Sequence, residues 1–178
     1  MVDTMTSNQT ITRDSDAHRR QVRKVQKAIA GSSFATLATV SEAGRPHVAG
    51  VVYEATQDAI WVHTMRSSRK ARNVAVSPFA AVCIPLRKLP AGPPYTIHFQ
   101  AAAELVAMDA EPAVRLIEAG QLSGISGHGA LEEPDGVLLR LTPRGAVHSY
   151  GLGTNPIELI RDPLHSGARS VDLDRVTR

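Results

Sequence analysis

Cysteine and aromatic residues are scarce in this chain of 178 residues, and each scarcity excludes a class of protein. The single cysteine, Cys83, cannot form an intramolecular disulfide, which excludes a small domain stapled by disulfides. Aromatic residues make up 4% of the chain, and no basic motif with interleaved aromatics is present for stacking bases. We therefore predict no nucleic-acid partner.

Metal-ligand spacings and long apolar runs are also missing. The seven histidines are scattered without an HxxxH spacing, and one cysteine cannot make a CxxC pair, so we predict no metal site. No apolar run approaches the length of a transmembrane helix, and the polar first residues contain no apolar signal segment. We therefore predict a cytoplasmic protein with no membrane partner.

The composition that is present is typical of a folded domain. Apolar residues make up 43% and charged residues 21% of the chain, and the net charge is +3. A length of 178 residues suits one domain with a substantial core. We expect the polar segment 1–15 to be a disordered tail, 16–153 to be the folded domain, and 154–178 to be a C-terminal tail or an arm on a partner subunit.

Short segments with a strand-like period alternate with turns through most of the domain. Strands are expected over 34–40, 47–55, 60–65, 80–86 and 95–106, with one or two more within 136–150. Helices are expected over 16–30, from 68 to about 78, and from 109 to 120, and the glycine-rich segment 121–135 is expected to be a mobile loop. Six antiparallel strands with helices between and beside them favour a small β-barrel.

The third expected strand and the following helix meet at a basic, hydroxyl-rich joint. Thr64 lies at the end of the strand, Ser68 is a good N-cap, and Arg69 and Lys70 open the helix. Unpaired N–H groups and a partial positive charge at a helix start attract anions, and the neighbouring cations favour a phosphate. The alternative is that these charges form an ordinary solvated face.

The joint, written Thr64-x-x-x-Ser68-Arg69-Lys70 and followed by Pro78, resembles the flavin-phosphate segment of the pyridoxamine 5′-phosphate oxidase-like family, the FMN-binding split barrels. The resemblance extends over 34–151, with the elements in the same order. It implies a mainly β fold, a six-stranded antiparallel split barrel with flanking helices. It also implies a homodimer with two cofactor sites at the interface.

The resemblance further implies a function: a flavin- or deazaflavin-dependent oxidoreductase that uses FMN or coenzyme F-420 to transfer a hydride to or from a small organic substrate. No catalytic side chain is assigned, and Tyr53 is the candidate substrate contact. The implied cofactor-binding residues are His63, Thr64, Ser68, Arg69 and Lys70 around the phosphate, with Val51 of the second strand and Thr96 of the fifth near the ring.

Two alternatives stay open. Some split barrels bind haem or another tetrapyrrole, or hold a flavin without turnover, and His128, His148 or His165 would then be a candidate axial ligand. The other alternative is a basic regulator that binds nucleic acid through its first helix, with an affinity that falls steeply with salt.

Overall fold

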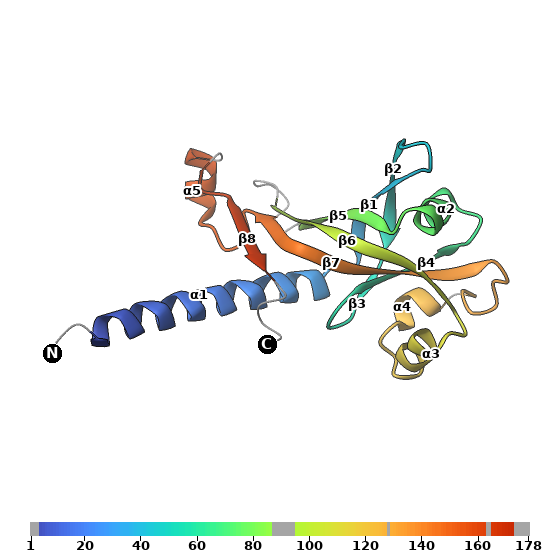
Figure 1. Ribbon diagram of the computed structural model, residues 1–178, viewed down its shortest axis with the longest axis horizontal. Coiled ribbons are helices and arrows are strands. Elements are labelled where there is room, and N and C mark those ends of the chain that lie inside the picture. Colours follow the sequence, from blue (N-terminus) through green and yellow to red (C-terminus); the bar gives the residue numbers. More distant parts are fainter. Residues whose placement is uncertain (1–3, 87–94, 128, 163–164, 173–178) are drawn as a thin grey trace.

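The computed structural model describes residues 4–86, 95–127, 129–162 and 165–172, and its centre is one antiparallel sheet (Figure 1). The strands among these residues are β1 (Phe34–Val40), β2 (Pro46–Val52), β3 (Glu54–Ala55), β4 (Ile60–Met65), β5 (Phe79–Leu86), β6 (Tyr95–Ala107), β7 (Gly136–Tyr150) and β8 (Ala168–Asp172). Hydrogen bonds join them in the order β2-β1-β5-β6-β7-β4-β3, and β8 pairs with β7. The helices are α1 (Thr4–Ala30), α2 (Arg69–Val76), α3 (Glu111–Glu118), α4 (Ser123–Ser126) and α5 (Pro156–Arg161). None of the helices in the described part of the chain is long and apolar enough to cross a bilayer.

The two ends of this sheet approach each other without being joined. The path starts at β2 and ends at β4 and β3, and within the described residues it includes no pairing of β2 with β4. Residues of both strands nevertheless line one cavity, because the twisted sheet curls back on itself. The predicted mainly β split barrel with flanking helices is therefore confirmed, and the split lies between β2 and β4.

Strand boundaries differ from the predicted ones at two places. The strand expected over 47–55 is interrupted at Tyr53, whose backbone N–H donates to the carbonyl of Ser33 at 2.8 Å. The segment 136–150 is one strand of 15 residues, although its proline and glycine suggested a break. It stays continuous because its register against β6 shifts once and Gly145 takes a positive φ of 67°.

Both ends of the described chain are more regular than the sequence predicts. Helix α1 begins at Thr4, within the segment 1–15 that we expect to be a disordered tail. A helix extends readily past an existing turn, because each added residue gains one hydrogen bond. The predicted tail 154–178 contributes α5 and β8, and β8 pairs with β7 along its length.

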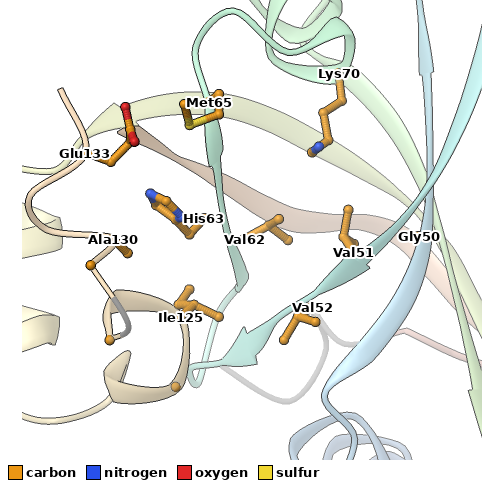
Figure 2. Close-up of a pocket in the computed structure, with 13 residues that line it drawn as sticks. Gly50, Val51, Val52, Val62, His63, Met65, Lys70, Ile125, Ala130 and Glu133 are labelled. Atoms are coloured by element: carbon orange, nitrogen blue, oxygen red, sulfur yellow. The ribbon is translucent and has the colours of Figure 1, made fainter. Parts of the chain in front are cut away.

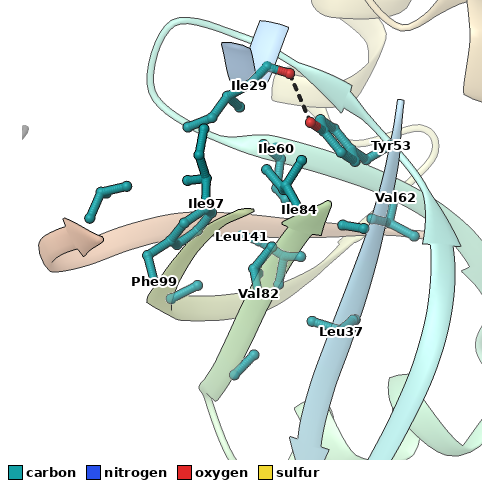
Figure 3. Close-up of a cluster of buried hydrophobic side chains, with 14 of the residues drawn as sticks. Ile29, Leu37, Tyr53, Ile60, Val62, Val82, Ile84, Ile97, Phe99 and Leu141 are labelled. Atoms are coloured by element: carbon teal, nitrogen blue, oxygen red, sulfur yellow. Dashed lines mark hydrogen bonds between the residues drawn. The ribbon is translucent and has the colours of Figure 1, made fainter. Parts of the chain in front are cut away.

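The core fills the inside of the curled sheet (Figure 3). Helix α1 covers one end with its predicted apolar stripe, since Val22, Val25 and Ile29 are all buried. A smaller cluster around Trp61 packs beneath α3 and α4 on the other side of β4. The two clusters hold β4 rigidly, and β4 leads directly into the basic joint.

One face of the sheet stays uncovered in this chain. The sequence predicts that strand β5 is central and buried. It does lie centrally, between β1 and β6, but only alternate residues of the strand are buried. Its first residue, Phe79, is 69% exposed. On the neighbouring strands β1 and β2, Phe34, Val48 and Val52 are also exposed, and Phe34 lies opposite Val52. This apolar surface, formed by Phe34, Val48, Val52 and Phe79, is called the open face below.

Candidate functional site

The joint between β4 and α2 is capped as the sequence predicts. The side-chain oxygen of Ser68 accepts a hydrogen bond from the backbone N–H of Ala71 at 3.3 Å. The same oxygen accepts from the Thr64 hydroxyl at 3.2 Å. Because both lone pairs are engaged, the hydroxyl hydrogen of Ser68 is left to donate to a ligand.

The first turn of α2 carries further unsatisfied donors. In the described part of the chain, the backbone N–H groups of Arg69 and Lys70 have no acceptor, as is usual for the first positions of a helix. The turn contains no acidic side chain that would compete for them. With the partial positive charge of the helix end, these groups form a site suited to an anion.

The split between β2 and β4 contains a cavity of about 550 Å³, called the split pocket below (Figure 2). Val51 and Val62 form apolar walls on the two strands, and Lys70 reaches from α2 toward the gap between them. The other lining residues are Gly50, Val52, His63, Met65, Gly124, Ile125, Gly127, Gly129, Ala130 and Glu133. The pocket therefore has a cation at one end and apolar walls beyond it.

His63 points from β4 toward the loop that carries Ala130 and Glu133 (Figure 2). Its Nε2 atom is enclosed and has no hydrogen-bond partner among the described residues. Gly136 makes room for the ring, because a Cβ there would lie 3.1 Å from Nε2. Burial lowers the pKa of His63 below its usual value, while the negative charge of Glu133 acts in the opposite direction. The imidazole is therefore neutral near pH 7.

The segment 121–135 forms a wall of the split pocket and is tethered at both ends by carboxylates. At its start, the Glu54 carboxylate accepts from two successive backbone N–H groups near the beginning of α4, at 3.0 and 3.2 Å. At its end, the Asp135 carboxylate accepts from the backbone N–H of Ser67 at 3.0 Å. The expected mobile loop is thus bound to both β3 and the joint.

Sequence reasoning missed the pocket residues that this loop supplies. Ile125, Ala130 and Glu133 line the split pocket, yet none of them belongs to a recognisable motif. The high glycine content signals a loop but not the strand that the loop covers. Its tethers join residues 68 to 71 positions apart, which only the folded chain brings together.

A second cavity of about 590 Å³ adjoins the start of α2 and is called the basic cleft below. Arg69 and Arg72 of α2 line it together with Arg45 and His47 from the β1–β2 hairpin. Arg69 therefore belongs to the basic cleft, whereas the adjacent Lys70 belongs to the split pocket. The joint thus presents cations to two neighbouring cavities.

Most of the predicted cofactor residues lie together. Val51, His63 and Lys70 line the split pocket, and Thr64 and Ser68 are hydrogen-bonded to each other at the joint beside it. Thr64 itself is buried, so its hydroxyl acts on a ligand through Ser68.

Two predicted residues lie elsewhere. Tyr53, the candidate substrate contact, is fully buried, and its hydroxyl donates to the carbonyl of Ile29 at 2.8 Å (Figure 3). Burial raises the pKa of Tyr53 to about 12. Its side chain thus ties α1 to the core and is not available to a substrate. Thr96 lies on β6 opposite Tyr150 and does not line the split pocket of its own chain.

The candidate axial histidines are dispersed. His148 stacks on His98 of the neighbouring strand, with ring centroids 5.4 Å apart. His165 is exposed, and its Nδ1 lies 2.8 Å from the Asp162 carboxylate. His128 lies outside the described residues. Within the described ranges, no group of three or more metal-ligating side chains is placed to hold an ion.

A family model described as pyridoxamine 5′-phosphate oxidase matches residues 22–147, which is well over half of the chain. The chain belongs to the pyridoxamine 5′-phosphate oxidase family. No curated protein matches the sequence. The matched family region includes β2, β4, the joint and the tethered loop, so the whole split pocket lies within it.

Solved structures with the same fold include proteins that are described as binding different groups. The haem storage protein HutZ from Vibrio cholerae is 23% identical with a TM-score of 0.60, and the alignment covers 76% of this chain and 96% of HutZ. An FAD-binding protein from Mesorhizobium loti is 18% identical with a TM-score of 0.57, over 70% of this chain and 87% of that one. An F-420 reductase is 18% identical with a TM-score of 0.52, over 67% and 92%. These similarities confirm the split barrel and leave the cofactor of this family member to be argued from its own residues.

Proposed function

We propose that this protein is a flavin- or deazaflavin-dependent oxidoreductase that binds FMN or coenzyme F-420 in the split pocket. It would transfer a hydride to or from a small organic substrate. The observation that carries the proposal is the position of Lys70, beside unsatisfied helix N–H groups at one end of a pocket with apolar walls. A cofactor with an anionic end and a flat, largely apolar ring system matches that arrangement.

The residues at the joint fit a phosphate group. Lys70, the Ser68 hydroxyl and the N–H groups of the first turn of α2 would donate to it. Hydrogen bonds to a charged group contribute about 1.5–3 kcal/mol each. Val51 and Val62 would hold the ring system between the strands. When bound, the flavin supplies the hydride chemistry, which requires no protein nucleophile.

His63 and the tethered loop would control the surroundings of the ring. With Nε2 enclosed, Nδ1 is the ring nitrogen of His63 that is left to meet a ligand. A neutral imidazole at that position offers one hydrogen bond without adding charge to the pocket. The loop, fixed by Glu54 and Asp135, would exclude water from one side of the reacting centre.

The basic cleft supports the deazaflavin over FMN. Its three guanidinium groups adjoin the same helix start as Lys70 and outnumber the one lining carboxylate, Glu42. Coenzyme F-420 carries additional negative charge on its tail, and Arg45, Arg69 and Arg72 would bind it, although Arg72 also donates to the Ser67 carbonyl. FMN, with one phosphate, would leave part of this positive charge without an anionic partner.

We also propose that the protein is a homodimer that associates through the open face. Phe34, Val48, Val52 and Phe79 present large apolar side chains to solvent on one face of the sheet. Contiguous exposed apolar surface of this kind marks an interaction site. Val52 belongs both to the open face and to the lining of the split pocket. A second copy would therefore cover the open side of the pocket, and its Thr96 would approach the cofactor there.

The alternative function is haem binding without turnover, and the similarity to the haem storage protein HutZ supports it. Haem needs an accessible axial ligand. Among the described residues that line the split pocket, His63 is the one histidine, and with Nε2 enclosed only its Nδ1 could serve. His148 and His98 are exposed but do not line this pocket. We favour a flavin because Lys70 and the first N–H groups of α2 match a phosphate.

The test is a titration of the purified protein with FMN, coenzyme F-420 and haem, followed by fluorescence or absorbance. We expect saturable binding of a flavin in the micromolar range or tighter, and weaker binding by the Lys70→Ala variant. A reduced flavin that then passes its hydride to added acceptors would establish the enzyme class. Tight haem binding without flavin affinity would replace the proposal by the alternative, and binding of none of the three would refute both.

A further inference from the structure

We propose that a third cavity is a separate binding site for a small amphipathic anion, a medium-chain carboxylate. The cavity has a volume of about 920 Å³ and lies between the end of α1, the β3–β4 turn and strands β6 and β7. We call it the α1 cavity. It shares no lining residue with the split pocket, so the inference does not depend on the proposed function.

The floor of the α1 cavity is apolar. Ile29, Ile60 and Phe99 line it, and they belong to the core inside the barrel (Figure 3). These three side chains are almost fully buried, and Ala30 and Ala55 extend the apolar surface toward solvent. A hydrocarbon chain that packs on this surface leaves water and gains dispersion contacts. The volume also lies within the range of about 300–1,000 Å³ that is usual for small-molecule sites.

The wall formed by the β3–β4 turn is fixed in place by hydrogen bonds. The backbone N–H of Thr56 donates to the carbonyl of Ala59 at 2.8 Å, and the Thr56 hydroxyl donates to the Asp58 carboxylate at 3.0 Å. Arg140 donates to the other oxygen of Asp58 at 2.6 Å. The turn is therefore held open independently of any ligand, which lowers the cost of binding.

The unpaired charge at the cavity is positive. Partial burial raises the pKa of Asp58, but hydrogen bonds from Arg140 and Thr56 outweigh it and lower the pKa, so Asp58 is an ionised and paired carboxylate. Lys27 on α1 also lines the cavity, and its ammonium group has no ion-pair or hydrogen-bond partner among the residues described. An amphipathic molecule with an anionic head would thus place its chain on the apolar floor and its charge beside Lys27.

The chain contains its own reporter for this site. Trp61 is the single tryptophan, and its Nε1–H donates to the Thr56 hydroxyl oxygen at 3.3 Å. Because Thr56 lines the cavity, a ligand there would change the environment of the indole group. The experiment is a titration of the full chain with decanoate and, separately, with the uncharged decanol, following Trp61 fluorescence.

We expect a saturable fluorescence change with both molecules. Lys27→Gln should weaken the affinity for decanoate about two- to fivefold, which is the range for an exposed ion pair, and leave the affinity for decanol unchanged. Lys24→Gln removes an exposed cation of the same helix that does not line the cavity, and it is the matched control. Ala30→Phe, at an exposed position on the rim, should block both molecules, and Thr142→Leu provides a second filling variant on β7.

Three results would overturn the proposal. One is a fluorescence response that does not saturate with either molecule. Another is decanoate affinity that is the same in Lys27→Gln as in Lys24→Gln. The third is decanoate binding that Lys70→Ala abolishes, because that would place the ligand in the split pocket. Circular dichroism of each variant would show that the fold is retained.

Discussion

Ser67 donates two hydrogen bonds to one oxygen of the Asp135 carboxylate, one from its backbone N–H at 3.0 Å and one from its hydroxyl group. This contact fastens the end of the segment 121–135 to the joint that precedes α2. Together with Glu54 at the other end, it keeps the wall of the split pocket closed. The joint that carries the candidate anion site therefore also positions the loop over the pocket.

The contact with Ser67 predicts an acid-sensitive element. Its hydrogen bonds lower the pKa of Asp135, so the carboxylate stabilises the fold above its unfolded pKa of about 3.9 and loses this effect as the pH falls through the folded value. Asp135→Asn should lower the urea midpoint near pH 7. The difference from the wild type should vanish at a pH below both values. An equal deficit at both pH values would contradict the assignment, and Glu132→Gln, exposed on the same loop, is the control.

His63 should titrate below its usual range because its ring is partly buried. Glu133 raises this pKa through its negative charge, so Glu133→Gln should lower it further. The measurement is an NMR titration of the imidazole in the wild type and the variant. The fold should also lose stability as the pH falls below about 6.5, because the unfolded chain then binds the proton more readily. A higher pKa in Glu133→Gln would show that the two side chains do not interact as described.

Lys70 and Arg69 should differ in the ligand that each supports. Lys70→Ala should weaken the affinity for FMN about tenfold or more, since a lost charged hydrogen bond costs about 1.5–3 kcal/mol. Arg69→Ala should affect coenzyme F-420 more than FMN, because Arg69 lines the basic cleft. Isothermal titration calorimetry with both cofactors would measure the difference. If the double variant binds both as tightly as the wild type, the phosphate assignment is wrong.

The open face should control the oligomeric state. Phe79→Glu would place a charge in the proposed interface and should convert the proposed dimer to monomers in sedimentation velocity. The monomer should remain folded, because Phe79 is 69% exposed within one chain. Ile160 on α5 is equally exposed at 69% and lies outside the open face, so Ile160→Glu is the matched control. A wild-type monomer, or a Phe79→Glu dimer, would argue against this surface as the interface.

Tyr53 should matter for stability and not for ligand binding. Tyr53→Phe removes the buried bond to Ile29 and should cost about 0.5–1.5 kcal/mol of unfolding free energy, because the Ile29 carbonyl keeps a bond from Ser32. Because the pKa of Tyr53 is raised, its contribution to the unfolding free energy is complete below about pH 10 and is lost as the pH rises through about 12. The Tyr53→Phe variant should lack this pH-dependent loss of stability. Denaturant titrations and cofactor affinity would be measured together. If a stably folded Tyr53→Phe variant binds the cofactor more weakly than the wild type, Tyr53 contributes to the binding site and the prediction is wrong.

Much of the site could be predicted because it depends on a short, continuous segment. The N-cap at Ser68, the cations after it and the strand before it are neighbours in the sequence, so local rules are sufficient. The outcome for Tyr53 shows where such rules stop. Alternation along the strand expected over 47–55 indicates that the Tyr53 side chain faces one side, but only the docking of α1 decides that this side is the core.

The sequence by itself determined the order of the strands from β1 to β7 and of helices α1, α2 and α3, the capped basic joint and the resemblance to the family. These features follow from turn residues, hydrophobic period and motif spacing, which act over a few residues. The tertiary structure alone decided that Lys70 and Arg69 serve two different cavities and that Glu54 and Asp135 tether the loop. It also decided that the open face remains uncovered in one chain. Each of these depends on segments far apart in the sequence that meet only when the sheet curls, and no local pattern encodes where they meet.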